Sequence, residues 1–295
     1  MQTGNTLPKK SSSTSKWLIG CGIGCGVIVL IAVILAISGF FFVKNIVQEF
    51  EEAETLMETL TERYGQIKDF CPEPDGTIKP EQMETFLAVR EAMAPVREKL
   101  ERSFDVLARE TREGQMEEPP PSVLTKIKTG IELAPLIGEL LKSRTQALLD
   151  AGMGMGEYYY IYVVSYYSWL GKSPADSPGV RVGDQDERRG IVVWDDEENE
   201  EDRLERRLRR LHRKILPMLH NQYEKLTEGR VSGVGEQWRK KLAAEIEAME
   251  SDRFRLLWQD GLPKVLEDSL KPYRTRLEAS YSKTLNPFEI AYSQR

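Results

Sequence analysis

A run of 27 residues without a single charge, from Trp17 to Val43, constrains this chain more than any other feature of its sequence. A helix needs ~20 apolar residues to cross the hydrocarbon core of a bilayer, so this run is long enough to span one with some tilt. Trp17 stands at one end and the aromatic run 40–42 at the other, where membrane interfaces favour aromatic rings. The sequence therefore predicts one transmembrane helix at residues 17–43.

The charges that flank the predicted span indicate its orientation. Lys9, Lys10 and Lys16 precede it, and residues 1–43 contain no acid. Cytoplasmic flanks are enriched in Lys and Arg, so we expect a cytoplasmic tail at residues 1–16 and the rest of the chain outside. A cleaved signal peptide has a shorter apolar core, and a lipoprotein box follows its core instead of preceding it, so a signal-anchor is favoured.

The cytoplasmic half of the span carries two interleaved Gly-x-x-x-Gly patterns. Small residues at this spacing let two helix backbones approach closely, although glycine is common in transmembrane helices in any case. The pattern indicates a possible helix-association face and hence a homodimer. Its members are Gly20, Gly22, Gly24 and Gly26.

Net charge and cysteine content exclude several classes of function. The chain carries −6 overall, and because residues 1–43 contribute +3, the remainder carries −9. An acidic body is unsuited to nucleic acid, because phosphate contacts need clustered cations. Cys71 is the sole cysteine after the span, so this part can form no disulfide within itself and no cysteine-based zinc site. It is either a free thiol or the partner of its twin in a dimer.

A heptad stripe follows the span directly. Apolar side chains recur at intervals of 3 and 4, which predicts a helical stalk over residues 44–68. The stripe is either a coiled-coil seam between two chains or one helix packing on its own domain, and three heptads do not distinguish the two. Its members are Ile46, Phe50, Ala53, Met57, Leu60, Tyr64 and Ile67.

The remaining patterns predict an all-α extracytoplasmic domain of several helices. Its first part covers residues 69–170, an acidic flexible loop covers 171–202, and its second part covers 203–295. Within the loop, residues 191–194 form a short apolar patch that we expect to dock on the domain. The Tyr-rich run Tyr158–Leu170 favours strand residue by residue. We predict a buried central helix instead, because no second strand of comparable length exists to pair with it.

Four segments of the chain carry a family resemblance: 74–76 with Phe86–Glu91, Gly156–Leu170, Leu216–Gln222 and Tyr281–Glu289. Together they resemble uncharacterised bacterial envelope proteins that are anchored by a lipid or a single helix. The resemblance covers residues 62–292 and implies a bacterial source and a helical domain. It implies no activity and no catalytic residue. With the predicted span, we expect the chain in the bacterial inner (plasma) membrane.

Two groups of side chains are candidate binding sites. Tyr158, Tyr162, Tyr166 and Trp169 would suit a pocket for an apolar or lipid-like ligand, although aromatic helices of this kind are usually core. A basic stripe would suit an anionic partner, but the acids at 195–202 precede it closely and favour internal neutralisation. The stripe comprises Arg203, Arg206, Arg210 and Arg213.

Signals for catalysis and cofactors are absent or weak. His212, His220 and Glu224 would share a helix face, but they lack a His-Glu-x-x-His pattern and Pro217 interrupts them. No Gly-x-Ser-x-Gly elbow occurs, and pairs of carboxylates are expected by chance among so many acids. We therefore expect no cofactor or metal, and a protein-interaction or scaffolding module with an envelope protein as its partner. A ligand-binding module is the second hypothesis, and a carboxylate-based envelope enzyme is the third.

Overall fold

The computed structural model describes residues 51–114, 123–176, 180–182, 192–194, 199–228 and 234–289. The predicted cytoplasmic tail, the span at 17–43 and its four glycines lie outside these residues. Within the described ranges, no helix is both long and apolar enough to cross a membrane. The anchor therefore stays a prediction, and the account below concerns the compact unit Glu49–Arg295.

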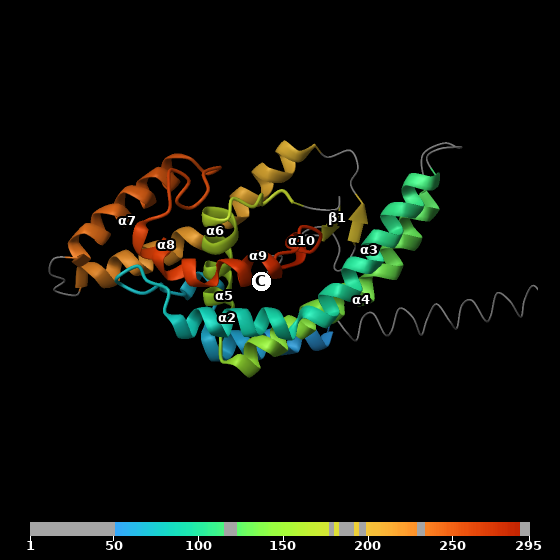
Figure 1. Ribbon diagram of the computed structural model, residues 1–295, viewed down its shortest axis with the longest axis horizontal. Helices are drawn as coiled ribbons and strands as arrows, with labels where there is room; N and C mark the ends of the chain where they lie inside the picture. Colours follow the sequence, from blue (N-terminus) through green and yellow to red (C-terminus); the bar gives the residue numbers. More distant parts are fainter. Residues whose placement is uncertain are drawn as a thin grey trace, which may run out of the picture. The chain divides into compact units, whose positions relative to one another are not determined.

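The described chain is helical, which confirms the predicted class (Figure 1). The first half comprises a helix at 51–64, then η1 (Ile67–Asp69), α2 (Pro80–Ala92), α3 (Ala94–Gly114), α4 (Val123–Ala151), α5 (Met155–Tyr162) and η2 (Val163–Trp169). Two short strands follow, β1 (Val180–Val182) and β2 (Val192–Trp194). The second half comprises α6 (Glu200–Glu228), α7 (Val234–Ser251), α8 (Lys264–Leu270), η3 (Lys271–Tyr273), α9 (Arg274–Ser280) and α10 (Asn286–Glu289).

The Tyr-rich run forms the buried centre, as the sequence predicts. Every residue of α5 except Glu157 is buried, and α5 continues directly into η2, a π-helix. The wider turn is visible in the backbone, where the amide of Leu170 donates to the carbonyl of Ser165, five residues back, at 3.0 Å. π-turns are rare and arise where packing outweighs regular helix geometry. Here they place consecutive bulky tyrosines on several sides of one element.

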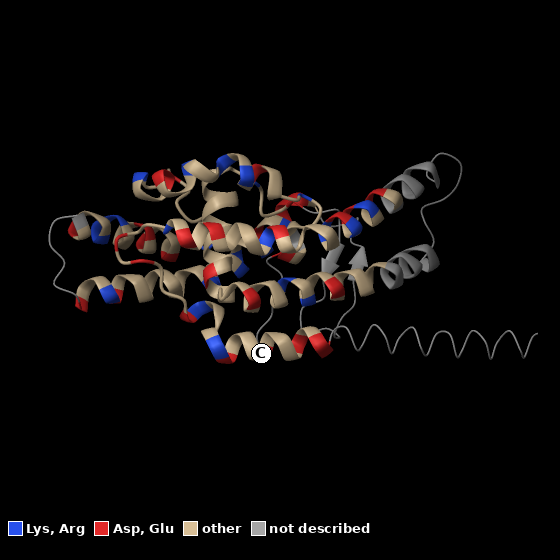
Figure 2. Cartoon of the chain, turned by 60° about the horizontal axis from the view of Figure 1, so that its bottom comes forward, with Lys and Arg blue, Asp and Glu red and all other residues tan. Residues whose placement is uncertain are grey.

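Helices surround this centre. α4 contacts both α2 and α3, while α6 contacts α7 and η1. Figure 2 shows Lys and Arg positions interspersed with Asp and Glu positions along the described helices.

The predicted loop at 171–202 contains structure that the sequence did not indicate. β1 and β2 pair antiparallel, with Arg181 opposite Val193. β2 contacts α4, so the apolar patch at its end of the loop does dock on the helical domain. One short two-stranded ladder thus accompanies the all-α body within the described residues.

The heptad stripe packs on its own domain. Met57 and Leu60 are 6% and 1% exposed, and Ala53 and Ile67 are buried as well. Glu52 also forms an ion pair with Lys142 of α4. Four of the five described members of the stripe are thus unavailable as a seam between chains, and Tyr64 is exposed, so the coiled-coil alternative is not supported there. The helix also ends at residue 64 instead of continuing to 68, because Gly65 adopts a left-handed conformation with φ of 80°.

The glycine-rich segment 152–156, where α4 ends and α5 begins, has a well-defined backbone structure. Gly152 has φ of 73°, its amide donates to the carbonyl of Leu149, and the amide of Met153 donates to that of Leu148. These two bonds make a Schellman cap, which satisfies carbonyls that the helix end would leave unpaired. Gly156 then allows α5 to approach η1, because a Cβ there would lie 2.6 Å from the Cβ of Phe70 and 2.7 Å from the carbonyl oxygen of Ile67.

We expect Gly156→Ala to destabilise the fold by ~1–3 kcal/mol, the usual cost of overpacking. The gain in helix propensity, about 1 kcal/mol, is outweighed because one of the clashing atoms is backbone. Urea unfolding followed by circular dichroism measures the change. Glu58→Ala, at an exposed helix position, serves as the control and should shift the stability by no more than ~0.5 kcal/mol. A stabilised Gly156→Ala variant would contradict the close approach.

Candidate functional site

Three arginines from three neighbouring helices are buried side by side with the aromatic centre. Arg90 of α2, Arg144 of α4 and Arg97 of α3 are 0%, 1% and 8% exposed. Burying a guanidinium is costly unless a counter-charge and hydrogen bonds replace its water. The partners of these arginines therefore define the site.

Glu289, in the last described helical turn, supplies the counter-charge. Its Oε2 lies 3.2 Å from Nη1 of Arg90 and accepts a hydrogen bond from the Tyr158 hydroxyl at 2.8 Å. Its Oε1 lies 3.7 Å from Nε of Arg97. Burial by itself would raise the pKa of Glu289, but the charges of Arg90 and Arg97 outweigh it and hold that pKa below its ordinary value. The carboxylate is therefore ionised at neutral pH.

All three nitrogen atoms of the Arg90 guanidinium donate hydrogen bonds. Nη1 donates to the Tyr158 hydroxyl at 2.9 Å, Nε donates to Oγ of Ser280 at 3.2 Å, and Nη2 donates to the Ser280 carbonyl. Its Cζ lies 5.0 Å from the ring centroid of Tyr166 and 5.4 Å from that of Tyr162. Burial opposes the charge, yet the electrostatic effect of Glu289 and the neighbouring tyrosines raises the pKa of Arg90 well above its ordinary value. The guanidinium is thus a permanent cation in the core.

Asn286, one helical turn before Glu289, organises a second half of the network. Its Oδ1 accepts hydrogen bonds from Tyr162 at 3.0 Å and from Tyr167 at 2.6 Å. Its Nδ2 donates towards the carbonyls of Ser173, Pro174 and Asp176 at 3.0–3.3 Å. One fully buried amide thus ties the central π-helix to the segment that follows it.

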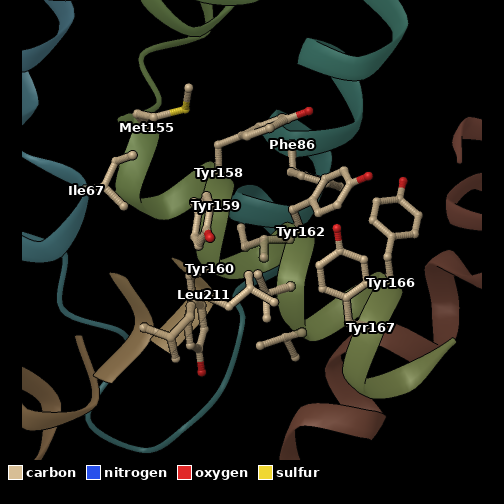
Figure 3. Close-up of a cluster of buried hydrophobic side chains, with 14 of the residues drawn as sticks. Ile67, Phe86, Met155, Tyr158, Tyr159, Tyr160, Tyr162, Tyr166, Tyr167 and Leu211 are labelled. Atoms are coloured by element: carbon tan, nitrogen blue, oxygen red, sulfur yellow. The ribbon is translucent and has the colours of Figure 1, made fainter. Parts of the chain in front are cut away.

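The tyrosines form a continuous array in this network, and Figure 3 shows four of them, Tyr158, Tyr162, Tyr166 and Tyr167, along one stretch of chain. Ring centroids are 6.2 Å apart between Tyr158 and Tyr162 and 4.6 Å apart between Tyr162 and Tyr166. Burial raises the pKa of each hydroxyl above its ordinary value. All four therefore stay protonated and act as hydrogen-bond donors throughout the physiological pH range.

The structure brings three of the four predicted pocket residues together. Tyr158, Tyr162 and Tyr166 adjoin one another, but their hydroxyls bond Glu289, Asn286 and Ser280 of the chain itself. Trp169 lies apart from that set of hydrogen bonds, half-buried, with Cζ of Arg274 at 5.6 Å from its ring centroid. Occupation of these residues by a ligand stays a prediction.

The four arginines of the basic stripe lie on the first half of α6, and their binding of an anionic partner stays a prediction. Arg203, Arg206 and Arg210 are half-buried, and Arg213 is exposed. Between them Arg207, which the stripe omitted, donates to the carbonyls of Pro174 and Asp176. Burial, together with the neighbouring arginines, lowers the pKa of Arg207. The same carbonyls face Asn286, so this part of α6 supports the network.

The two histidines of α6 have separate partners. Nε2 of His212 lies 2.9 Å from the carbonyl of Arg255, and Nε2 of His220 lies 3.1 Å from Oε1 of Glu250. Among the residues that the structure describes, no group of three or more His, Cys, Asp or Glu side chains is arranged to hold a metal ion.

Sequence reasoning did not identify Arg90, Arg97, Arg144, Asn286 and Glu289 as site residues. One signal was present: Arg90 stands four residues after Phe86 and three before Met93, so it occupies an apolar helix face. A charged residue on such a face predicts a buried counter-charge, but helix periodicity does not identify the acidic residue that provides it.

The chain matches no protein-family model, no curated protein and no solved structure, so the resemblance to bacterial envelope proteins stays a prediction.

We expect Glu289→Gln to destabilise the fold by ~3–5 kcal/mol, because Arg90 would lose the counter-charge that offsets its burial. Because the pKa of Glu289 is lowered in the folded state, its contribution is present above its ordinary value of 4.5 and is lost as the pH falls through the folded-state pKa. Below pH ~4.5, the wild-type chain should therefore lose more stability than the variant does.

Chemical denaturation at several pH values measures both effects. Glu84→Gln is the matched control, since it removes an exposed carboxylate that pairs with Arg276 at 2.7 Å, and it should change stability by no more than about 1 kcal/mol. Equal effects of the two substitutions would show that the buried pair has no special role.

Proposed function

We propose that the chain is a membrane-anchored, extracytoplasmic protein-interaction or scaffolding module of the bacterial envelope. The anchor is the uncharged run at 17–43, with the N-terminus in the cytoplasm. The predicted stalk, residues 44–68, would connect this anchor to the helical body outside the cytoplasm.

The buried network is the observation that carries this proposal. A general acid or base works best with a pKa near the operating pH and with access to a substrate. Glu289 has a lowered pKa, is 1% exposed, and is held by Arg90 and Tyr158. This buried cluster of charged and polar side chains thus holds the helices of the described body together, which supports a rigid binding body over an enzyme.

The surface of the body supports protein partners over nucleic acid. Charges of both signs are mixed along its helices (Figure 2), and residues 44–295 are acidic overall. Among the described residues, Val106 of α3 and Tyr64 are the large hydrophobic side chains that solvent reaches most, at 54% and 36%. Such side chains are candidate contact points, because apolar and aromatic groups dominate the centres of protein interfaces.

The predicted topology has a direct test in a bacterial host. A reporter that is active only outside the cytoplasm should be active when fused after Arg295 and inactive when fused before Met1. The full chain should resist extraction by alkaline carbonate, whereas a chain without residues 17–43 should be soluble. Carbonate release of the full chain would contradict the anchor.

The interaction role is tested by photo-crosslinking in cells, with a crosslinking amino acid at position 106 of the full chain. We expect position 106 to capture one recurrent envelope protein. This capture should be lost in the Arg102→Glu variant, which changes an exposed residue one turn earlier on the same helix. Position 240 on α7, whose side chain is 75% exposed, is the control. Recovery of the monomer alone from position 106, and also from Tyr64 as a second exposed position, would count against the proposal.

A further inference from the structure

Residues 281–289, called here the C-terminal segment, insert several side chains into the core although they form the last described part of the chain. Leu285, Asn286 and Phe288 are 0% exposed, and Glu289 is 1% exposed, whereas Lys283 faces solvent. The ring of Phe288 stacks on Phe104 of α3, with centroids 5.9 Å apart. These four side chains are thus as buried as those of the central helix.

The segment is recognised group by group, as a bound peptide would be. Asn286 and Glu289 are three residues apart and therefore lie on one face of the turn that α10 forms. Two tyrosine hydroxyls meet the amide oxygen, and two arginines meet the carboxylate. Arg144 donates to the carbonyls of Phe288 and Glu289 at 3.0 and 2.8 Å. We call the receiving residues the seat: Arg90, Arg97, Arg144, Tyr158, Tyr162 and Tyr167.

The seat is built by elements that contact one another directly. α2, α3 and α4 carry its arginines, and α4 contacts both α2 and α3, while α2 contacts α5. The C-terminal segment holds its own turn separately, since the amides of Asn286, Phe288 and Glu289 donate to carbonyls of Ser282 and Leu285 inside it. Receiver and ligand are therefore distinct local structures, which meet only through tertiary contacts.

We propose that the seat is a peptide-binding site that recognises an asparagine and a glutamate three residues apart, and that the chain's own C-terminal segment occupies it. When the segment leaves, a peptide with the same two groups takes its place. Three buried cations and the tyrosine hydroxyls supply both the affinity and the selection, because an uncharged side chain at the glutamate position leaves a guanidinium unpaired. The site does not depend on the proposed interaction function, so the two can fail separately.

The test uses the full chain in detergent and a fluorescent, C-terminally amidated peptide of residues 280–289. The tethered segment competes at high effective concentration, so the wild-type chain should bind the peptide weakly. Glu289→Gln weakens the chain's own segment, and this variant should bind the peptide at least tenfold more tightly by fluorescence anisotropy. A peptide with Gln at the position of Glu289 should lose at least tenfold in affinity, and the Glu84→Gln chain should behave as wild type.

Binding that is equal for the wild-type and Glu289→Gln chains, or equal for the two peptides, would overturn the proposal. Circular dichroism shows whether Glu289→Gln is folded. If it is not, hydrogen exchange on the wild-type chain decides instead. We expect the amides of Asn286, Phe288 and Glu289 to exchange at least tenfold faster than those of residues 86–90 in α2, through release of the segment alone. Exchange of both groups at one common rate would mean that the segment leaves only when the whole body unfolds.

Discussion

The ion pair between Arg90 and Glu289 is the contact on which the described body depends. Neither side chain has measurable exposure, so their attraction acts where water screens little and where an unpaired charge would be most costly. The Tyr158 hydroxyl bonds both members of the pair, Ser280 accepts hydrogen bonds from Arg90, and Nε of Arg97 lies 3.7 Å from the other carboxylate oxygen of Glu289. Because these residues come from α2, α3, α5 and the end of α9, one carboxylate connects elements that are otherwise distant in the chain.

Asn286 extends the same arrangement to the other side of the tyrosine array. It accepts from Tyr162 and Tyr167 and donates to the carbonyls that Arg207 also reaches. Buried hydrogen bonds of this kind select one arrangement over near alternatives, because an unmade bond is costly where water cannot replace it. Tyrosine at these core positions, in place of leucine, adds this selectivity, since the hydroxyls of Tyr158, Tyr162, Tyr166 and Tyr167 each bond a particular side chain.

The sequence analysis and the structure differ mainly over which groups the buried side chains contact. Helical periodicity identified Met57 and Leu60 as buried, but a second chain and the chain's own domain satisfy the same stripe equally well. The Tyr-rich run forms the central helix that the sequence predicts. That prediction depended on the lack of a second long strand to pair with the run, although its residues individually favour strand. The π-turns that follow Tyr162 were not predictable, since π-helices are rare and no sequence pattern in this run indicated one.

By itself, the sequence determined the helical class, the apolar faces of the helices and the uncharged run at 17–43, because these follow from composition and local periodicity. Only the tertiary structure decided which acid neutralises Arg90 and which amide receives the tyrosines. Tyr158 and Glu289 are 131 positions apart, and the chain offers 47 acids. Local patterns report which side chains are buried, whereas the pairing of buried charges is set by how whole helices meet.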